Sequence, residues 1–298
     1  MADILTRAIT KDGFLKISVV VSTESCEKAR EYHNTSPVAT AALGRLLSAG
    51  LLMGSELKED EAKLTVQLKG NGPLGTVLVS ANSKGEIKGY VENPYVELPL
   101  KDNGKLDVGT AVGAGTLSVI KDIGLKEPYI GQVEIQTGEV GEDIAYYFAL
   151  SEQVPTFVSL GVLVDTDCSV KHSGGLIIQV MPDCDDETLT KLENSVRDIM
   201  SMTEMLSNGM STEEIIKYVM LGFQVDILES SEVSFNCDCS RDRMEKAIVS
   251  LGKAEIQGII DDLGEAEIVC QFCNTAYKFD KNELAEMKEK ARDLSDKK

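Results

Sequence analysis

The chain has 298 residues, with 30 basic and 49 acidic side chains and a formal net charge of −19. This acidic balance argues against a nucleic-acid partner, because phosphate binding requires a basic face. A chain of this length can bury a stable core without disulfides. Its first residues lack the basic start and apolar run expected of a signal peptide, and the sequence has no uninterrupted apolar run of membrane-spanning length. We therefore expect a cytosolic protein with no membrane partner, in a compartment where thiols stay reduced.

Residues 1–183 combine strand patterns with helical patterns. Alternating or β-branched runs predict strands at 15–21, 63–68 and 132–136. A helix is predicted over 37–53, because Pro37 suits the first turn, Ser36 can cap it and leucines recur along one face. The mixture predicts one α+β domain with a sizeable antiparallel sheet.

Residues 184–232 are acidic and have a helical spacing of apolar side chains. One helix is predicted over 186–207, and a second begins at Ser211, which forms a capping-box pattern with Glu214. Half of the 10 methionines of the chain lie within 200–220. They can pack the helices on the first domain or serve a surface for irregular partners. Both uses are compatible if packing in one state becomes exposure in another.

Residues 233–298 contain two close pairs of cysteines, Cys237-Asp-Cys239 and Cys270-Gln-Phe-Cys273. Each pair can hold one edge of a tetrahedral Zn²⁺ site. A segment of this size has a marginal core and needs a staple, which a metal can supply. We therefore predict one zinc ion bound by four thiolates, followed by a charged terminal helix over 281–294. The cations Arg241, Arg243 and Lys246 either offset the charge of the site or are ordinary surface charges.

The same four cysteines permit redox chemistry. Zinc holds sulfur as thiolate, which is the form that oxidants attack. A sulfenic acid formed at one ligand weakens the site, and a neighbouring thiol can then close a disulfide. Loss of the metal would unfold the third segment and loosen whatever packs against it. The chemistry permits this switch without requiring it, since most four-cysteine zinc sites are purely structural.

Several stretches of the sequence resemble the redox-regulated holdase chaperones called thirty-three-kilodalton chaperonins, or heat-shock protein 33 homologues. The main match is Phe235-Asn-Cys-Asp-Cys-Ser-Arg-Asp-Arg243 together with Cys270-Gln-Phe-Cys273. Further matches lie at 115–122, 129–133, 147–155 and 174–182, so the resemblance covers nearly the whole chain.

The resemblance implies an α+β N-terminal domain over 1–183, a helical linker over 184–232 and a small zinc-binding redox-switch domain over 233–298. It also implies a reduced, zinc-bound, inactive monomer. Oxidation would form the disulfides Cys237–Cys239 and Cys270–Cys273, release zinc and unfold the switch domain and linker. The oxidised form would dimerise and hold unfolding client proteins without ATP, against oxidative and heat aggregation. Such a protein is not an enzyme and has no catalytic residues.

Two other functions fit the cysteines less well. A thiol–disulfide oxidoreductase would use Cys270 and Cys273, but that pair lies outside the strand-to-helix setting of a thioredoxin motif. A zinc-ribbon regulator would bind nucleic acid or protein, and the acidic charge argues against the former.

Glycine-rich stretches at 70–75 and 109–115 lack a Gly-Lys-Ser/Thr continuation and indicate turns or close strand approaches. The remaining His and Cys residues are expected to be non-catalytic: His33, His172, Cys26, Cys168 and Cys184.

Overall fold

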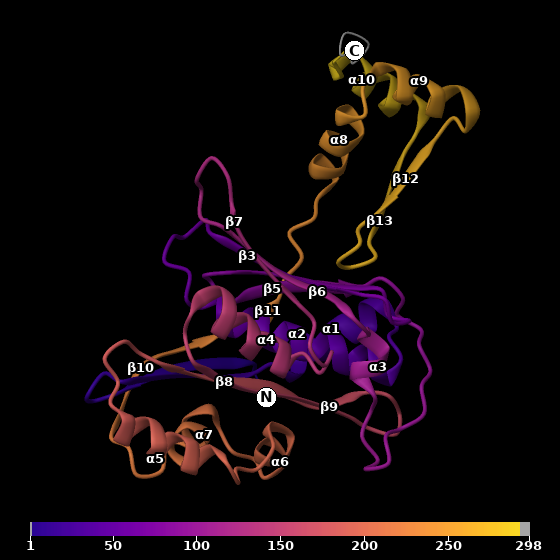
Figure 1. Ribbon diagram of the computed structural model, residues 1–298. Coiled ribbons are helices and arrows are strands. Elements are labelled where there is room, and N and C mark those ends of the chain that lie inside the picture. The colour runs from indigo at the N-terminus through magenta and orange to yellow at the C-terminus, as the bar shows by residue number, and fades with distance from the viewer. Residues whose placement is uncertain (1, 293–298) are drawn as a thin grey trace. The chain divides into compact units, whose positions relative to one another are not determined.

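The computed structural model describes residues 2–292. The chain divides into two compact units, Met1–Asn236 and Cys237–Lys298. Figure 1 shows the elements of both. Each unit is described by itself below.

The first unit contains two sheets. One is a five-stranded antiparallel sheet in the order β10-β1-β2-β9-β8. Its strands are β1 (Ile4–Thr10), β2 (Leu15–Val21), β8 (Thr156–Val164), β9 (Val170–Val180) and β10 (Val225–Glu232). The other has the order β11-β5-β4-β3-β6-β7, and only the short β11–β5 pair is parallel. Its strands are β3 (Lys63–Gly70), β4 (Thr76–Asn82), β5 (Glu86–Val91), β6 (Gly115–Asp122), β7 (Tyr129–Glu134) and β11 (Ser234–Phe235).

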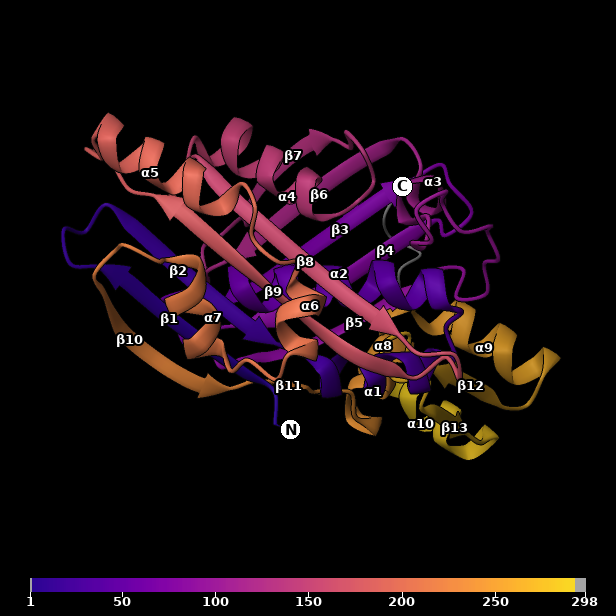
Figure 2. The same cartoon turned by 90° about the horizontal axis from the view of Figure 1, so that it is seen from below.

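Two helices, α1 (Thr23–His33) and α2 (Pro37–Gly54), lie between these sheets (Figures 1 and 2). A helix that is apolar on all sides must be buried on all sides, and nearly every side chain of α2 is buried. Of the helices in residues 2–292, α2 alone is long and apolar enough to cross a membrane, but 89% of its apolar window is buried in the protein. It is therefore the core helix of this unit. The shorter elements are α3 (Val108–Val112), α4 (Gly141–Tyr147) and the π-helical turn η1 (Phe148–Glu152).

Three further helices cover the other face of the five-stranded sheet (Figure 2). They are α5 (Asp186–Val196), α6 (Met202–Ser207) and α7 (Thr212–Val219). Their buried side chains form one cluster with β1, β2 and β9, made of Leu192, Met202, Met205, Leu206, Ile215, Ile216, Val219 and Met220 against Ala8, Leu15, Ile17, Val19, Leu176 and Ile178. The linker methionines therefore pack on the first domain in this state.

Hydroxyl groups fix α7 to the sheet beneath it. The Oγ1 atoms of Thr6 and Thr212 lie 2.7 Å apart, and Thr6 Oγ1 also lies 3.0 Å from Ser230 Oγ. These bonds join β1 to both ends of the linker segment that follows α6. They make the docked position specific, because a buried hydroxyl that lost its partner would be costly.

The second unit is small and consists of α8 (Arg241–Ser250), α9 (Lys253–Asp262), α10 (Lys281–Lys290) and a hairpin of β12 (Ala266–Val269) and β13 (Ala276–Phe279). Its buried cluster comprises Ile248, Ile256, Ile260, Phe279, Leu284, Met287 and Ala291. The helices α8 and α9, which the sequence analysis did not predict, supply much of this core.

The α+β fold class is confirmed, and several local predictions need correction. The helix expected over 186–207 is two helices, because α5 ends at its C-cap Arg197 and a new helix, α6, starts at its N-cap Ser201. Ser36 does not cap α2, since its hydroxyl donates to the carbonyl oxygen of Val96 at 2.7 Å. Phe235, expected in the third segment, belongs to the first unit, where its ring lies 5.5 Å from that of Tyr32.

The linker shares one compact unit with the first domain and ends in β10, an edge strand of its sheet. The division of the chain at 183 and 232 into functional segments stays a prediction. The capping box between Ser211 and Glu214 is present as expected. The terminal helix expected over 281–294 is α10, and its last two predicted positions lie outside the described residues.

Candidate metal centre

The second unit brings the four predicted cysteine ligands together. The Sγ atoms of Cys237, Cys239, Cys270 and Cys273 all lie within 4.8 Å of one another. Two contacts across the pairs measure 3.7 Å, from Cys237 to Cys270, and 3.4 Å, from Cys239 to Cys273. A tetrahedron with zinc–sulfur bonds of about 2.3 Å has edges of about 3.8 Å. The four thiols therefore lie close enough to hold a metal ion of this size.

The hairpin positions Cys270 and Cys273, since both lie in the turn that joins β12 to β13. The backbone N–H of Cys270 donates to Thr275 at 3.0 Å, and that of Asn274 donates to Cys270 at 2.8 Å. Asn274 has a φ of 54°, a left-handed conformation that Asn tolerates better than most residues. The tight turn aims both sulfurs at one point and buries them.

The other pair lies in the extended segment before α8. Ser240 caps α8 by accepting a hydrogen bond from the N–H of Arg243 at 3.3 Å, which ends the segment directly after Cys239. Cys237 and Cys239 are half-buried. An extended backbone sends the side chains of residues i and i+2 to the same face, so both sulfurs can turn inward from this segment while Asp238 stays exposed. The Asp238 carboxylate accepts from Arg243 at 2.6 Å, which ties this extended segment to α8.

Hydroxyl groups contact two of the sulfurs. Tyr277 Oη lies 3.1 Å from Cys239 Sγ, and Thr275 Oγ1 lies 3.2 Å from Cys273 Sγ. The sequence analysis missed both residues. The sequence feature that could have indicated them is their spacing from the cysteine motif: Thr275 lies two positions after Cys273, at the end of the turn, and Tyr277 lies four positions after it, on β13. Donors to metal-bound sulfur orient the ligands and stabilise the thiolate.

The pKa values of the clustered thiols shift in opposite directions, upward for Cys237 and Cys239 and downward for Cys273. Burial raises the pKa of Cys237 and of Cys239. Burial also acts to raise the pKa of Cys273, but hydrogen bonds from Thr275 and the neighbouring thiols outweigh it and bring the pKa to about 7. Four sulfurs this close cannot all ionise without a cation between them. The donor set therefore fits a soft divalent metal.

The nearby cations are mostly engaged elsewhere. Arg241 pairs with Glu283 at 2.6 Å and lies over the Phe279 ring, and Lys246 pairs with Asp242 at 2.6 Å. Arg243 pairs with Asp238, and the charges of Cys237 and Cys239 add to the rise of its pKa. Of the three cations considered from the sequence, Arg243 is therefore the one for which an electrostatic interaction with the cysteine cluster is found.

Comparison with known proteins gives the family. The family model described as "Hsp33 protein" matches residues 3–280. A 33 kDa chaperonin of Agathobacter rectalis is 49% identical over 288 residues, which cover 97% of this chain and 100% of that protein. The chain belongs to the Hsp33 family. A 33 kDa chaperonin of Clostridium beijerinckii is 46% identical, over 98% of this chain and 100% of that one.

The fold agrees with this assignment. The crystal structure of a 33 kDa chaperonin (heat shock protein 33 homolog) from Thermotoga maritima superposes with a TM-score of 0.88 and 36% identity, covering 97% of this chain and 98% of that one. The resemblance stated from the cysteine motif is confirmed. Membership of the Hsp33 family supports a chaperone role.

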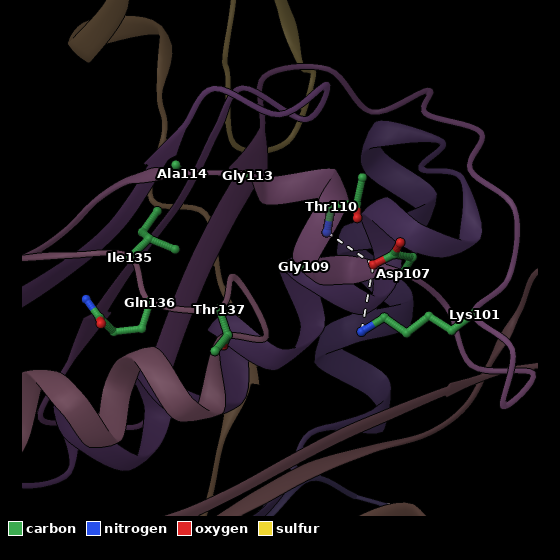
Figure 3. Close-up of a pocket in the computed structure, with 9 residues that line it drawn as sticks. All are labelled: Lys101, Asp107, Gly109, Thr110, Gly113, Ala114, Ile135, Gln136 and Thr137. Atoms are coloured by element: carbon green, nitrogen blue, oxygen red, sulfur yellow. Dashed lines mark hydrogen bonds and ion pairs between the residues drawn. The ribbon is translucent and has the colours of Figure 1, made fainter.

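A separate hollow in this Hsp33 chain lies beside α3, with a volume of about 540 Å³ (Figure 3). The two glycine-rich stretches meet at its edge. A Cβ on Gly70 would come within 1.9 Å of the Val112 carbonyl oxygen, and one on Gly113 within 2.5 Å of Asn71. These glycines therefore allow two chain segments to come into contact. This is the close approach of chain segments that the sequence analysis expected at the glycine-rich stretches.

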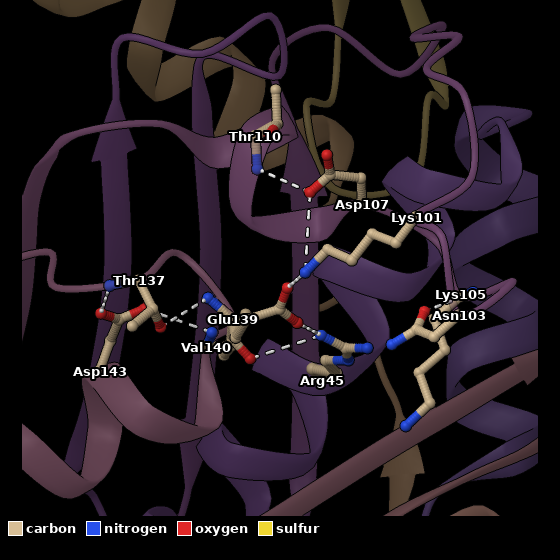
Figure 4. Close-up of polar contacts among 10 residues, drawn as sticks. All are labelled: Arg45, Lys101, Asn103, Lys105, Asp107, Thr110, Thr137, Glu139, Val140 and Asp143. Atoms are coloured by element: carbon tan, nitrogen blue, oxygen red, sulfur yellow. Dashed lines mark hydrogen bonds and ion pairs between the residues drawn. The ribbon is translucent and has the colours of Figure 1, made fainter.

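The charges around this hollow are paired with one another (Figure 4). Lys101 contacts the carboxylates of both Glu139 and Asp107. Arg45 donates to the same Glu139 at 2.7 Å. Asp143 accepts from the backbone N–H groups of Gln136 and Thr137. The ion pairs hold α2, α3 and the loops before α3 and α4 together, and the two cations, Lys101 and Arg45, balance the charges of Glu139 and Asp107.

The other residues singled out from the sequence lie in the first unit, apart from the cysteine cluster. His33 is buried, with Nε2 3.2 Å from the Gly89 carbonyl oxygen. Burial lowers the pKa of His172, which lies on β9. Cys26 is buried, and burial raises its pKa to about 12, so it is an unreactive thiol. Cys168 is exposed and Cys184 is half-buried.

Proposed function

We propose that this chain is a redox-regulated, ATP-independent holdase. In the reduced state Cys237, Cys239, Cys270 and Cys273 hold one Zn²⁺, and the chain is an inactive monomer. After oxidation it binds unfolding client proteins and protects them against oxidative and heat aggregation. The observation that carries the proposal is the cluster of four thiols, whose sulfurs lie within 4.8 Å of one another, in a unit with a small core.

The oxidation step is written for a peroxide. One thiolate attacks the peroxide, which breaks the O–O bond, gives a sulfenic acid and releases hydroxide, or water after protonation. The neighbouring thiol then attacks that sulfur, forms the disulfide and expels a second water. Two disulfides, Cys237–Cys239 and Cys270–Cys273, therefore consume two peroxide molecules and leave the metal without ligands.

Loss of the metal removes most of the stability of the second unit. Structural zinc contributes roughly 10–16 kcal/mol of apparent binding free energy, and this energy is coupled to folding. The unit has a single small cluster, and its hairpin is held at one end by the cysteine turn. Without the metal we expect α8, α9 and the hairpin to unfold together.

The change reaches the linker through the chain. Cys237 follows β11 after a single residue, and β11 pairs with β5 over two residues only. The side-chain amide of Asn236 donates to Glu86 at 2.7 Å, which adds one exposed contact. An unfolded segment beyond Asn236 would fray this short pairing, and β10 and the linker helices precede it directly.

Release of the linker would expose a large apolar surface. The cluster between α5–α7 and the sheet contains eight buried side chains from the helices and turns of the linker. Burial of one such side chain contributes about 1.5–3 kcal/mol. Both the freed sheet face and the Met-rich helices could then bind unfolding chains or a second copy, which fits the proposed dimer of the oxidised form.

The test follows bound zinc, free thiols and client aggregation on the same sample, before and after mild peroxide at raised temperature. We expect one zinc ion to leave as four thiols disappear, and aggregation of a heated client to fall. Cys168→Ser, which changes an exposed cysteine outside the cluster, should behave as the parent chain. Zinc and thiols that survived the treatment, with aggregation unchanged, would contradict the proposal. Catalytic turnover in an insulin-reduction assay would favour the oxidoreductase instead.

A further inference from the structure

Strand β8 is an open edge of the five-stranded sheet (Figure 2). Its pairing with β9 begins with a hydrogen bond from Val180 N–H to the Pro155 carbonyl at 3.0 Å. In an antiparallel ladder, hydrogen-bonded pairs recur at every second residue. Residues 157, 159, 161 and 163 therefore bond to β9, and Leu160, Val162 and Val164 turn their N–H and C=O groups outward.

This edge carries no charged side chain and no proline, and the one irregularity in its pairing with β9 is a register shift between Leu163 and Val164. Proteins protect open edges with charged residues, proline or bulges, because an exposed apolar strand pairs with other chains. The sequence of β8 is Thr-Phe-Val-Ser-Leu-Gly-Val-Leu-Val, without a charge or a proline. The opposite edge strand, β10, carries Asp226, Glu229 and Glu232. The uncharged edge of β8 before this register shift therefore suggests a binding surface.

A groove runs along the C-terminal half of β8. Residues 159–165 form one wall, Leu100 and 104–106 form the other, and 201–203 of the linker close one end, around a volume of about 440 Å³. Leu100 is 58% exposed and Leu163 is 37% exposed, so each wall offers an apolar side chain. An extended peptide that added to β8 would contact both walls.

The charged side chains that line the groove indicate which charge a bound peptide would have. Arg45 and Lys105 both line it, but Arg45 is directed at Glu139 and paired with it (Figure 4). Asp165 at the strand end lies 3.7 Å from Lys171. In the described part of the chain Lys105 has no carboxylate oxygen within 4.0 Å, although its charge helps to lower the pKa of Glu204 in the linker from a longer distance. A ligand carboxylate can therefore still pair with it directly. The loop fixes its place, since the Lys101 N–H donates to the Lys105 carbonyl at 2.9 Å.

We propose that the open edge of β8 binds an extended peptide segment that carries an acidic side chain. The segment pairs with the outward backbone groups of Leu160, Val162 and Val164 as an additional strand. Its carboxylate lies at Lys105 and its apolar side chains at Leu100 and Leu163. The site is present while the linker is docked, so the reduced chain binds such a segment without oxidation.

The linker also limits the length of this site. A Cβ on Gly161 would lie 2.9 Å from Thr203 Cγ2 and 3.1 Å from Met202 Cβ, so the start of α6 is seated on β8 beside Val162. Undocking of α6 would remove the wall formed by 201–203 and lengthen the groove. A longer peptide should therefore gain affinity when the linker is released, and a short one should not.

The experiment measures fluorescence anisotropy of a labelled peptide, in which valine and threonine alternate around one aspartate, with the reduced, zinc-loaded chain. We expect saturable binding and shifted amide resonances at Leu160, Val162 and Val164. Methylation of every second peptide nitrogen should abolish binding in one register and not in the other. Lys105→Glu should weaken the aspartate peptide about two- to five-fold and favour a lysine peptide. Lys126→Glu, the same charge change on the turn before β7, should have no effect.

Three results would overturn the proposal. These are absence of binding, binding that both methylation registers tolerate, and binding with no shift at the three β8 amides. Protection of those amides that rose with protein concentration instead would identify the edge as a self-association surface. Because the reduced chain is used, the outcome is independent of whether oxidation activates the protein, so this proposal and the proposed holdase can fail separately.

Discussion

The docking of the linker can be weakened without oxidation, by the substitution Ile216→Ala. Ile216 lies on α7, is fully buried and packs in the cluster against β1 and β2. Truncation of a buried isoleucine to alanine costs about 2–5 kcal/mol, since it removes apolar contacts and leaves a cavity. This cost falls on the docked state alone if the linker detaches as a unit. The population of the undocked state should then rise between about thirty-fold and several thousand-fold.

The assay follows amide hydrogen exchange of α6 and α7 and aggregation of a heated client, with the reduced, zinc-loaded chain. We expect faster exchange in both helices and measurable protection of the client without peroxide. Leu46→Ala is the matched control, because Leu46 is equally buried but lies on α2 between the sheets. It should lower the global stability by a similar amount and leave the linker docked.

The reasoning would be refuted if both variants behaved alike. Equal exchange rates in α6 and α7 would mean that the linker does not detach separately from the rest of the first unit. Faster exchange in Ile216→Ala with no client protection would mean that the surface beneath the linker does not bind clients.

Three more predictions concern the cluster and the caps. Cys273→Ser should abolish stoichiometric zinc binding and unfold the second unit, which zinc analysis and amide exchange of α8 and α9 would report. Tyr277→Phe removes the hydroxyl that contacts Cys239 at 3.1 Å, so we expect a 10- to 100-fold loss of zinc affinity in chelator competition. Ser201 and Ser211 hold the pKa of Glu204 and Glu214 below the ordinary value of 4.5. These caps should therefore stabilise the linker fully above that pH and less as the pH falls through the lowered values. The readout is the protection factor of the α6 and α7 amides, corrected for the slower intrinsic exchange in acid, which should be smaller than at neutral pH.

The sequence predicted those features that depend on local spacing. The pairs of cysteines, the α2 stripe after Pro37 and the Ser211–Glu214 box each lie within a few residues, so one pattern reports one contact. The strand at 15–21 was also found with the bounds of β2. Each of these patterns predicts structure well because it depends on neighbouring residues alone, and contacts with distant parts of the chain do not change it.

The features missed from the sequence depend on partners far along the chain. Ser36 is a good cap by type, but the Val96 carbonyl oxygen takes its hydroxyl. Phe235 looked like core for the zinc unit because it precedes Cys237, yet Tyr32 and β5 hold it in the first unit. The arrangement of Tyr277 and Thr275 at the sulfurs follows from the hairpin register, which the sequence does not reveal.

The geometry of the cluster also bears on which disulfides could operate a switch. The sulfur contacts across the pairs, Cys237 to Cys270 and Cys239 to Cys273, join residues 33 and 34 positions apart. A disulfide over such a separation would restrict the unfolded chain and stabilise the second unit by about 3–4.7 kcal/mol. It would replace the zinc staple with a covalent one. Disulfides within each pair close only small rings and leave the hairpin and the segment before α8 unconnected, so they oppose the proposed unfolding least.

This gives a prediction that separates the two pairings. Peptide mapping by mass spectrometry of the oxidised, client-binding form should find Cys237 linked to Cys239 and Cys270 linked to Cys273. A preparation oxidised slowly in the cold, while the unit stays folded, can instead trap the pairs that contact across the cluster. That form should retain the amide protection of α8 and α9 and should not protect clients, because its second unit is still tied together. Client protection by a chain with only the cross-linked pairs would show that activity does not require the second unit to unfold, and the proposed mechanism would then be wrong at its central step.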